Sequence, residues 1–253
     1  MDKIKVVRLT QTTDHPEEYL NNLVKITFSK KLNKGQDVIE TILDTTPGEL
    51  KLLKNIIKMN HTSILEQVDV TYAIIGGSRS LLAQITRHRM ASFLSSSQHY
   101  IDHTEMNDYE VPIEIIELNN PEVTETYLEG CKKAKNAYDK LVNEHRIDHA
   151  VARQTLPNAQ RNTLIMKANL RSWLNFLNLR LCGRNTSEIE YVAWLIKQDL
   201  NKYIPNVSKY FAPDCVVKGY CTQGKMCCGV KYSDENEKEK FKVLEGEKKW
   251  KLE

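Results

Sequence analysis

The sequence predicts an α+β fold, with one large domain, a small mixed or antiparallel sheet and long helices. Residues 3–9 and 68–75 place apolar side chains at about every second position, which is the pattern of a half-buried strand. Several longer stretches repeat apolar residues every three or four positions, as amphipathic helices do. The chain has 253 residues, of which 41% are hydrophobic, and this is enough to build a sizeable core.

Two helices are expected between these strands. The first covers 16–29, because its opening proline favours the first turn of a helix. The second covers 47–59, because Thr46 and Glu49 stand at the two ends of a capping box with proline between them. After the strand at 68–75, two glycines lead into a shorter helix with a buried apolar side.

Three longer helices and one short strand are expected in the rest of the chain. Apolar residues at helical spacing predict helices over 121–144, 162–181 and 187–203. The last of these opens with a second capping box, which begins at Ser187. Residues 110–114 are expected to form a brief edge strand, since their proline cannot donate a hydrogen bond in the middle of a sheet.

The charge balance and the hydropathy exclude several classes of protein. The formal net charge of +3 is too small for the basic field of a nucleic-acid binder. No stretch approaches the roughly 20 consecutive apolar residues of a membrane-spanning helix, and the N-terminus lacks the apolar region of a signal peptide. We therefore expect a cytoplasmic protein that binds neither nucleic acid nor a membrane.

One stretch, 84–100, combines cations and hydroxyls with the end of a helix. Arg87, His88 and Arg89 follow that helix, and four serines come before position 98. Basic residues at a helix end often only oppose the negative end of its dipole and contact solvent. Guanidinium groups beside serine hydroxyls, however, can hold a phosphate by charge-assisted hydrogen bonds. The combination favours a site for an anionic ligand.

Arg87-His88-Arg89, followed after seven residues by Ser97, resembles the signature of the flavin-dependent thymidylate synthases. Further blocks in the order of that family extend the resemblance from about residue 60 to residue 203. They are His61-x-Ser63-x-x-Glu66, Arg153-x-x-Leu156-Pro157, Asn169-x-Arg171 with Asn175, and Asn178-Leu179-Arg180. Any one block is a weak signal, but their common order is specific.

The resemblance implies a fold, an activity and an assembly. The fold would be a single domain like that of the thymidylate synthase complementing proteins over 1–232, with the Cys-rich end at 215–228 and a charged tail at 233–253. The activity would be methylation of dUMP to dTMP, with 5,10-methylenetetrahydrofolate as carbon donor, NADPH as reductant and FAD as the cofactor that carries the hydride. The assembly would be a homotetramer with active sites between subunits.

The resemblance also assigns roles to single residues. Arg180 would be catalytic, since a guanidinium beside the uracil ring stabilises negative charge that develops there. The residues that would bind the flavin, its nicotinamide and folate side included, are His61, Ser63, Arg87, His88, Arg89, Ser95, Asn169, Arg171 and Asn175. The residues that would bind the nucleotide are Gln84, Arg87, Ser97, Gln98, His99, Arg153 and Arg180.

Three positions depart from the fuller pattern of the family. Leu94 stands where the family has Asn, Ser95 where it has Glu, and His99 where it has Arg. A lost charge-assisted hydrogen bond costs roughly 1.5 to 3 kcal/mol. Two other functions are therefore open. One is a related flavin- and folate-dependent modification of another pyrimidine nucleotide, such as hydroxymethylation. The other is a catalytically inactive homologue that still binds flavin and nucleotide.

Four cysteines lie close together near the C-terminus, at Cys215, Cys221, Cys227 and Cys228. Four thiolates can bind zinc, but the intervals of five residues are longer than the usual two to four, so no metal is assigned. A zinc-binding nucleic-acid module therefore ranks below an enzyme. Cys131 is expected to be a small buried side chain. The Lys- and Glu-rich tail is expected to be a solvated helix or a frayed end.

Overall fold

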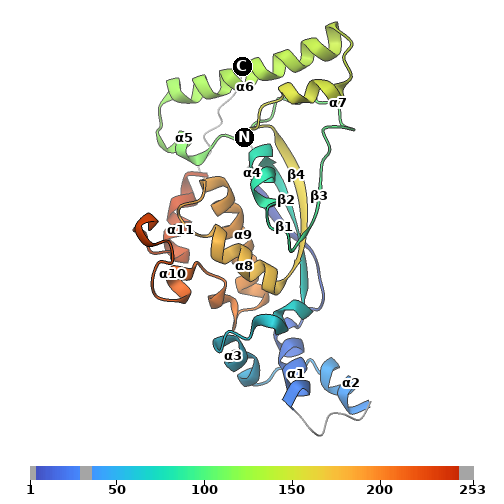
Figure 1. The fold of residues 1–253 in the computed structure, drawn as a ribbon, viewed down its shortest axis with the longest axis vertical. Coiled ribbons are helices and arrows are strands. Elements are labelled where there is room, and N and C mark those ends of the chain that lie inside the picture. The colour runs from blue at the N-terminus through green and yellow to red at the C-terminus, as the bar shows by residue number, and fades with distance from the viewer. Residues whose placement is uncertain (1–3, 29–35, 245–253) are drawn as a thin grey trace.

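The structure, a computed structural model, describes residues 4–28 and 36–244. At its centre is a four-stranded sheet in the order β1-β2-β4-β3, in which every neighbouring pair is antiparallel (Figure 1). The strands are β1 (Lys5–Gln11), β2 (Asp69–Ser78), β3 (Ser92–Ser95) and β4 (Arg161–Asn169). The expected α+β fold with a small antiparallel sheet is confirmed.

Helices surround the sheet in groups (Figure 1). One face of the sheet is covered by α4 (Arg79–Ile85), α8 (Leu170–Arg180) and α9 (Ser187–Tyr203). One end of the molecule holds α1 (Pro16–Phe28), α2 (Gln36–Leu43) and α3 (Lys51–Lys58). The other end holds α5 (Ile113–Glu117), α6 (Pro121–Asp139) and α7 (His149–Ala152). On the side of α9 lie α10 (Asp214–Val217) and α11 (Asp234–Phe241).

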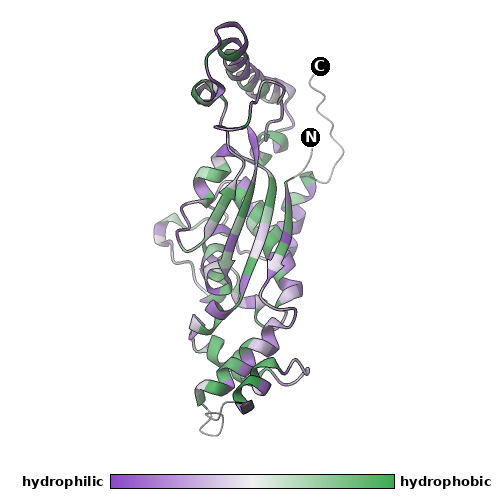
Figure 2. Cartoon of the chain, turned by 90° about the vertical axis from the view of Figure 1, so that its right-hand side faces the viewer, coloured by the Kyte–Doolittle hydropathy of each residue, from purple (hydrophilic) through white to green (hydrophobic). Residues whose placement is uncertain are grey.

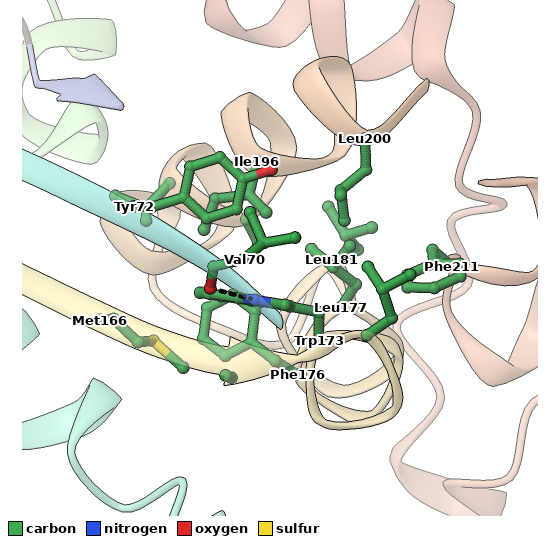
Figure 3. Packing of buried hydrophobic residues seen from close by; sticks show 14 of the residues in the cluster. Val70, Tyr72, Met166, Trp173, Phe176, Leu177, Leu181, Ile196, Leu200 and Phe211 are labelled. Carbon is green, nitrogen blue, oxygen red and sulfur yellow. Dashed lines mark hydrogen bonds between the residues drawn. The ribbon is translucent and has the colours of Figure 1, made fainter. Parts of the chain in front are cut away.

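The main core lies between the sheet and the helices α8 and α9 (Figure 3). The indole N–H of Trp173 on α8 donates to the carbonyl oxygen of Val70 on β2 at 3.1 Å. The Trp173 ring meets Tyr72 edge-on, with the centroids 5.2 Å apart. A buried N–H without a partner would cost about 1–3 kcal/mol, so this hydrogen bond, together with the ring contact, holds α8 in one position on the sheet.

The opposite face of the sheet is left open by the described helices, as the strands at the front of Figure 2 show. The strand register aligns four apolar residues across this face, because Val7 pairs with Ala73, Ala73 with Ile165, and Ile165 with Leu94. Val7 is 46% exposed and Leu94 is 68% exposed, whereas Ile165 is partly buried and Ala73 is buried between its neighbours. A single chain thus presents an apolar row that is exposed at its two ends, and we define the open apolar row as these four residues.

The expected helix over 162–181 is wrong in its first half, where the chain forms β4. Leu164, Met166 and Ala168 alternate into the core with the period of a strand. The amide oxygen of Asn169 accepts from the backbone N–H of Ser172 at 2.9 Å and so caps α8. The helical spacing after Leu170 concealed the shorter period of the strand before it.

Three smaller expectations are also wrong. The helix α3 starts at Lys51, and its N-cap Leu50 has no capping side chain, so the box expected at 46–49 does not form. The Ser187 hydroxyl donates to Glu114 Oε1 at 2.7 Å instead of capping α9. Residues 113–117 form the short helix α5, where an edge strand over 110–114 was expected.

Other expectations hold. The helices α1, α6 and α9 lie over the predicted ranges, although the last residue of the range 16–29 falls outside the described residues. Cys131 is buried on α6. In the charged tail, residues 234–241 form α11, and residues 245–253 lie outside the described residues. Phe241 is buried and packs on Trp194 of α9, with the ring centroids 5.5 Å apart. This part of the tail therefore belongs to the core. Among the described helices, none has the length and apolar character to cross a membrane.

Candidate active site

A hollow of about 210 Å³ lies between the turn after α4, the strand β4 and the helix α8. It brings together five residues that the sequence analysis singled out. They are Arg87, His88, Arg89, Asn175 and Arg180. The remaining lining residues are Met90, Ala91, Met166, Ser172 and Leu179. Guanidinium groups from two distant segments of the chain therefore meet at one place, which suits an anionic ligand.

The turn that carries the three basic residues is fixed by its middle member. The helix α4 ends at Ile85, and the next strand begins only at Ser92. Arg87 and Arg89 are exposed, whereas the ring of His88 packs edge-on against Phe176 of α8 with the centroids 4.8 Å apart. The histidine thus anchors the turn to the core and leaves a guanidinium on each side of it free to contact a ligand.

Arg180 is held by two neighbours. Its Nε donates to His88 Nε2 at 2.9 Å, and its Nη1 donates to Asn185 Oδ1 at 3.1 Å. Burial, and then the nearby Arg180 guanidinium, lowers the pKa of His88 to about 4. His88 is therefore neutral near pH 7 and accepts through Nε2, which puts its proton on Nδ1. Burial also lowers the pKa of Arg180.

Asn185 is a functional candidate that the sequence analysis missed. Its amide nitrogen donates to the carbonyl oxygens of Leu179 and Cys182, both at 2.8 Å, at the C-terminal end of α8. Its amide oxygen is then turned toward Arg180. An asparagine two residues after a glycine at a helix end is the local signal that could have indicated it.

A second group of predicted residues lies at the other end of α8. Asn169 caps this helix, and Arg171 in its first turn forms an ion pair with Glu66. Glu66 belongs to the 3-10 helix Thr62–Gln67, which also contains Ser63 and follows His61. Ten residue steps of α8 separate its ends, or about 15 Å. Asn169 and Arg171 are not among the lining residues of the hollow that contains Arg180, although Ser172, the residue after Arg171, is one of them.

A third group lies beyond the end of β3, where the turn with the predicted Ser97 and His99 is bonded to α7, the helix that Arg153 directly follows. The backbone N–H of His99 donates to Ser97 Oγ at 3.2 Å, and Nε2 of His149 bonds the His99 carbonyl oxygen at 3.0 Å. Burial, and then the charge of Arg153, lowers the pKa of Arg79. In the described part of the chain, neither Arg153 nor Arg79 has an ion-pair partner. Two neighbouring guanidiniums of this kind suit an anion.

Three more predicted residues lie near these groups. Gln84 on α4 accepts through Oε1 from the Thr186 hydroxyl at 3.3 Å, next to the Asn185 that orients Arg180. Ser95 is the last residue of β3 and pairs with Leu164. Gln98 lies in the turn that follows β3. Arg79 was not predicted, because its neighbour Ser78 reads as the cap of α4 and Arg79 as an ordinary first residue.

The chemistry of the lining residues fits a flavin cofactor, but the hollow is too small to hold a whole flavin. Arg87 and Arg89 could pair with a diphosphate, and the Asn175 amide with a ring edge. A hollow of about 210 Å³ is smaller than the roughly 300–1,000 Å³ usual for ligand pockets. One chain therefore offers room for only part of such a ligand. No three His, Cys, Asp or Glu side chains within residues 4–28 and 36–244 are arranged to hold a metal ion.

Comparison with known proteins agrees with the motif order. Residues 8–206 match the family model described as thymidylate synthase complementing protein. A flavin-dependent thymidylate synthase of Clostridium tetani is 31% identical over 239 residues, which cover 88% of this chain and 92% of the relative. One of Thermococcus kodakarensis is 35% identical over 183 residues, which cover 69% of this chain and 73% of the relative.

The fold has a counterpart among solved structures. A crystal structure of the UMP/dUMP methylase PolB from Streptomyces cacaoi, bound with 5-Br dUMP, superposes with a TM-score of 0.66 over 83% of this chain and 95% of that chain. The two sequences are 18% identical, so this match supports the fold alone. Because the family model spans most of the chain and the Clostridium tetani relative matches over 92% of its length, the chain belongs to the thymidylate synthase complementing proteins, the flavin-dependent thymidylate synthase family, and is an enzyme of that family.

Proposed function

We propose that this enzyme methylates dUMP to dTMP, with 5,10-methylenetetrahydrofolate as carbon donor, NADPH as reductant and FAD as cofactor. The observation that carries the proposal is the position of Arg180. This residue is fixed by His88 and Asn185 in a hollow that also contains Arg87 and Asn175. Relatives that are called flavin-dependent thymidylate synthases support the same reaction.

Arg180 would activate the pyrimidine ring. Its Nε and Nη1 are already bonded, and in the described part of the chain Nη2 has no protein partner. This nitrogen can donate to a uracil oxygen and stabilise the negative charge that develops as the ring attacks the carbon donor. Neutral His88 helps, since it accepts from Arg180 and adds no competing positive charge. Bound FAD would supply the hydride that completes the methyl group.

The other predicted residues would bind and orient the ligands. We assign the phosphate of the nucleotide to Arg87, Ser97, His99 and Arg153, and its orientation to Gln84 and Gln98. We assign the flavin to His61, Ser63, His88, Arg89, Ser95, Asn169, Arg171 and Asn175. Arg79, which lies beside Arg153, would add a further donor at the phosphate.

We further propose that the complete site is shared between subunits of a homotetramer. Arg171 and Arg180 stand near opposite ends of α8, nine residue steps or about 13.5 Å apart, and the group with Ser97 and His99 lies beyond the end of β3. The apolar row across Val7, Ala73, Ile165 and Leu94 offers a surface that a second copy can cover. Light scattering on wild type and on Leu94→Asp tests this. We expect a tetramer and a smaller species respectively; a wild-type monomer contradicts the assembly.

The reaction is tested with dUMP, 5,10-methylenetetrahydrofolate and NADPH, after the absorption spectrum of the purified protein has been recorded. We expect a flavin spectrum and a product that is heavier than dUMP by one methyl group. Arg180→Ala should keep the flavin spectrum and lose turnover, whereas Lys132→Ala, an exposed change on the distant α6, should keep both. Wild-type turnover in Arg180→Ala would remove Arg180 from the catalytic role.

A second function is favoured by the three departures from the family pattern. Leu94 points to the open face of the sheet. His99 stands where the family pattern has an arginine, which is always charged, and its ring packs on Tyr100 with the centroids 4.7 Å apart. Both changes alter the predicted nucleotide side. Flavin- and folate-dependent modification of another pyrimidine nucleotide is therefore the alternative. Selective turnover of dCMP, or an added hydroxymethyl group, would favour it. A flavin spectrum that NADPH does not bleach would indicate an inactive homologue.

A further inference from the structure

Five cysteines gather around one hollow that the proposed reaction does not use. The hollow has a volume of about 320 Å³ and lies at the C-terminal end of α8, beside α11. Its cysteines are Cys182, Cys215, Cys221, Cys227 and Cys228, and all of them are free thiols. The sixth cysteine, Cys131, is buried on α6. Five free thiols in one hollow suggest a reaction of thiols that is separate from the proposed methylation.

Cys221 and Cys227 both line this hollow and stand on either side of the segment 222–226. The backbone N–H of Gly229 donates to the Cys227 sulfur at 3.4 Å. This hydrogen bond, and then the neighbouring Cys221 thiol, lowers the pKa of Cys227. Cys227 is also exposed. It is thus the accessible thiol that forms a thiolate most readily, with a second thiol beside it.

The other thiols fit less well. The Cys228 thiol donates to the carbonyl oxygen of Val230 at 3.5 Å and so is engaged by its own turn. Cys215 lines the same hollow and raises the pKa of Cys221 less than Cys227 does. No three of the thiols, all of which lie in the described residues, are placed to hold one metal ion. This arrangement favours the chemistry of a thiol pair over that of a metal site.

The segment between the two thiols borders the hollow of Arg180. Gln223 accepts through Oε1 from Nη1 of Arg184 at 3.0 Å, and the sulfur of Met226 accepts from Nη2 of Arg184 at 3.5 Å. Arg184 and Gln223 line, together with Arg180, a neighbouring hollow of about 420 Å³. A change in the segment 222–226 therefore reaches the wall beside the proposed catalytic residue.

We propose that Cys221 and Cys227 form a thiol–disulfide redox site that reacts with low-molecular-weight disulfides and alters the wall beside Arg180. The Cys227 thiolate attacks one sulfur of the small disulfide, whose S–S bond breaks and releases one small thiol. Cys221 then loses its proton and attacks the Cys227 sulfur, which releases the second small thiol. Two protein thiols are oxidised and one small disulfide is reduced to two thiols.

Closing the bond moves the segment between the cysteines. Cys221 and Cys227 are free thiols, whose sulfurs lie farther apart than the roughly 2 Å of a disulfide. Bond formation therefore shifts the segment that carries Gln223 and Met226 relative to Arg184. We expect the oxidised form to bind dUMP several-fold more weakly. This effect on the nucleotide rests on the proposed function, whereas formation of the disulfide does not.

Tryptic mapping tests the disulfide directly. The full-length protein is equilibrated with oxidised glutathione, alkylated and digested without reduction. Cleavage after lysines separates the cysteines into three peptides, which are Tyr210–Lys218 with Cys215, Gly219–Lys225 with Cys221, and Met226–Lys231 with Cys227 and Cys228. We expect the second and third peptides to be linked, and dithiothreitol to release them. Cys227→Ser should abolish the link, and the matched change Cys228→Ser should retain it.

Two results would overturn the proposal. One is the absence of the link between the second and third peptides, or a link that survives Cys227→Ser. The other is zinc or iron that copurifies at one or more ions per chain and protects the thiols from alkylation. Calorimetry with dUMP then compares the reduced and oxidised forms. Equal affinities refute the effect on the nucleotide, while a reduced protein that does not bind dUMP refutes the proposed function and leaves the disulfide standing.

Discussion

The neutral His88 that holds Arg180 predicts a loss of stability in acid. In the unfolded chain His88 takes up a proton as the pH falls through about 6.5, but in the folded chain burial and Arg180 lower its pKa to about 4. Between these values the unfolded state binds more protons than the folded state. The contribution of His88 to stability is therefore complete above about pH 6.5 and is lost as the pH falls toward about 4.

The size of the effect follows from the shift. A difference of about 2.5 pKa units at about 1.36 kcal/mol per unit would give roughly 3.4 kcal/mol. The ring of His88 is only partly buried, so solvent screening reduces this value. We expect roughly 1 to 2 kcal/mol. A protonated ring would in addition lose its ability to accept from Nε of Arg180.

His88→Gln isolates this contribution, because glutamine keeps an acceptor for Arg180 but does not titrate. Urea unfolding of both proteins is measured between about pH 7.5 and about pH 4.5. We expect the stability of the wild type relative to the variant to fall by roughly 1 to 2 kcal/mol over this range. His145→Gln, an exposed change away from the hollow, serves as the control. A difference between wild type and His88→Gln that does not vary with pH would refute the reasoning.

Three further predictions concern binding and packing. Arg153→Ala should weaken dUMP binding by about one to two decades in calorimetry and leave the flavin spectrum unchanged, since a charge-assisted hydrogen bond is worth roughly 1.5 to 3 kcal/mol; unchanged affinity would remove it from the phosphate site. Phe241→Ala should lower the free energy of unfolding in urea by about 3 kcal/mol, because its buried ring packs on Trp194; a change near zero would make the tail dispensable. Tyr72→Phe removes the hydroxyl that donates to Asp199 at 2.7 Å and should lower the free energy of unfolding in urea by about 1 kcal/mol. An unchanged free energy would mean that the ion pair with Arg8 holds Asp199 without this hydrogen bond.

The spacing of apolar residues in the sequence was enough to predict a helix or strand where one spacing runs through the whole element. The helices α6 and α9 and the strand β2 each bury one regular set of apolar residues, so the spacing alone indicates them. The spacing fails where two elements share one stretch. Between Arg161 and Arg180 a strand passes into a helix without a loop, and the only boundary mark is Asn169, which reads equally well as a polar residue on the face of a helix.

Capping boxes fail for a different reason, because tertiary contacts compete for the same side chains. Ser187 is the first residue of α9, one position after the N-cap Thr186, and Glu114 from the short helix α5 accepts from both its hydroxyl and its backbone N–H. No local pattern contains Glu114, which lies 73 residues earlier in the chain. The start of α9 was nevertheless predicted correctly, since its apolar spacing does not depend on the cap.

The contacts that shape the candidate site are of the same long-range kind. Arg180 and His88 are 92 residues apart, and only the packing of α8 against the sheet brings them to 2.9 Å. The motif order indicated that both residues matter, but not that they bond to each other. Asn185 was missed for a related reason: its role appears only once α8 is known to end at Arg180, which leaves carbonyl groups for the asparagine amide to cap.

The geometry of α8 explains why the motifs are spread along the chain. The helix carries Arg171 in its first turn and Arg180 in its last, nine residue steps or about 13.5 Å apart, so the two residues reach different parts of a ligand. Shortening the helix would bring them closer, but Trp173, Phe176 and Leu177 between them form part of the core and fix its length. A ligand long enough to meet both groups, or a second chain placed beside the first, therefore resolves the separation. An extended cofactor at a subunit interface would satisfy both conditions, which agrees with the homotetramer proposed above.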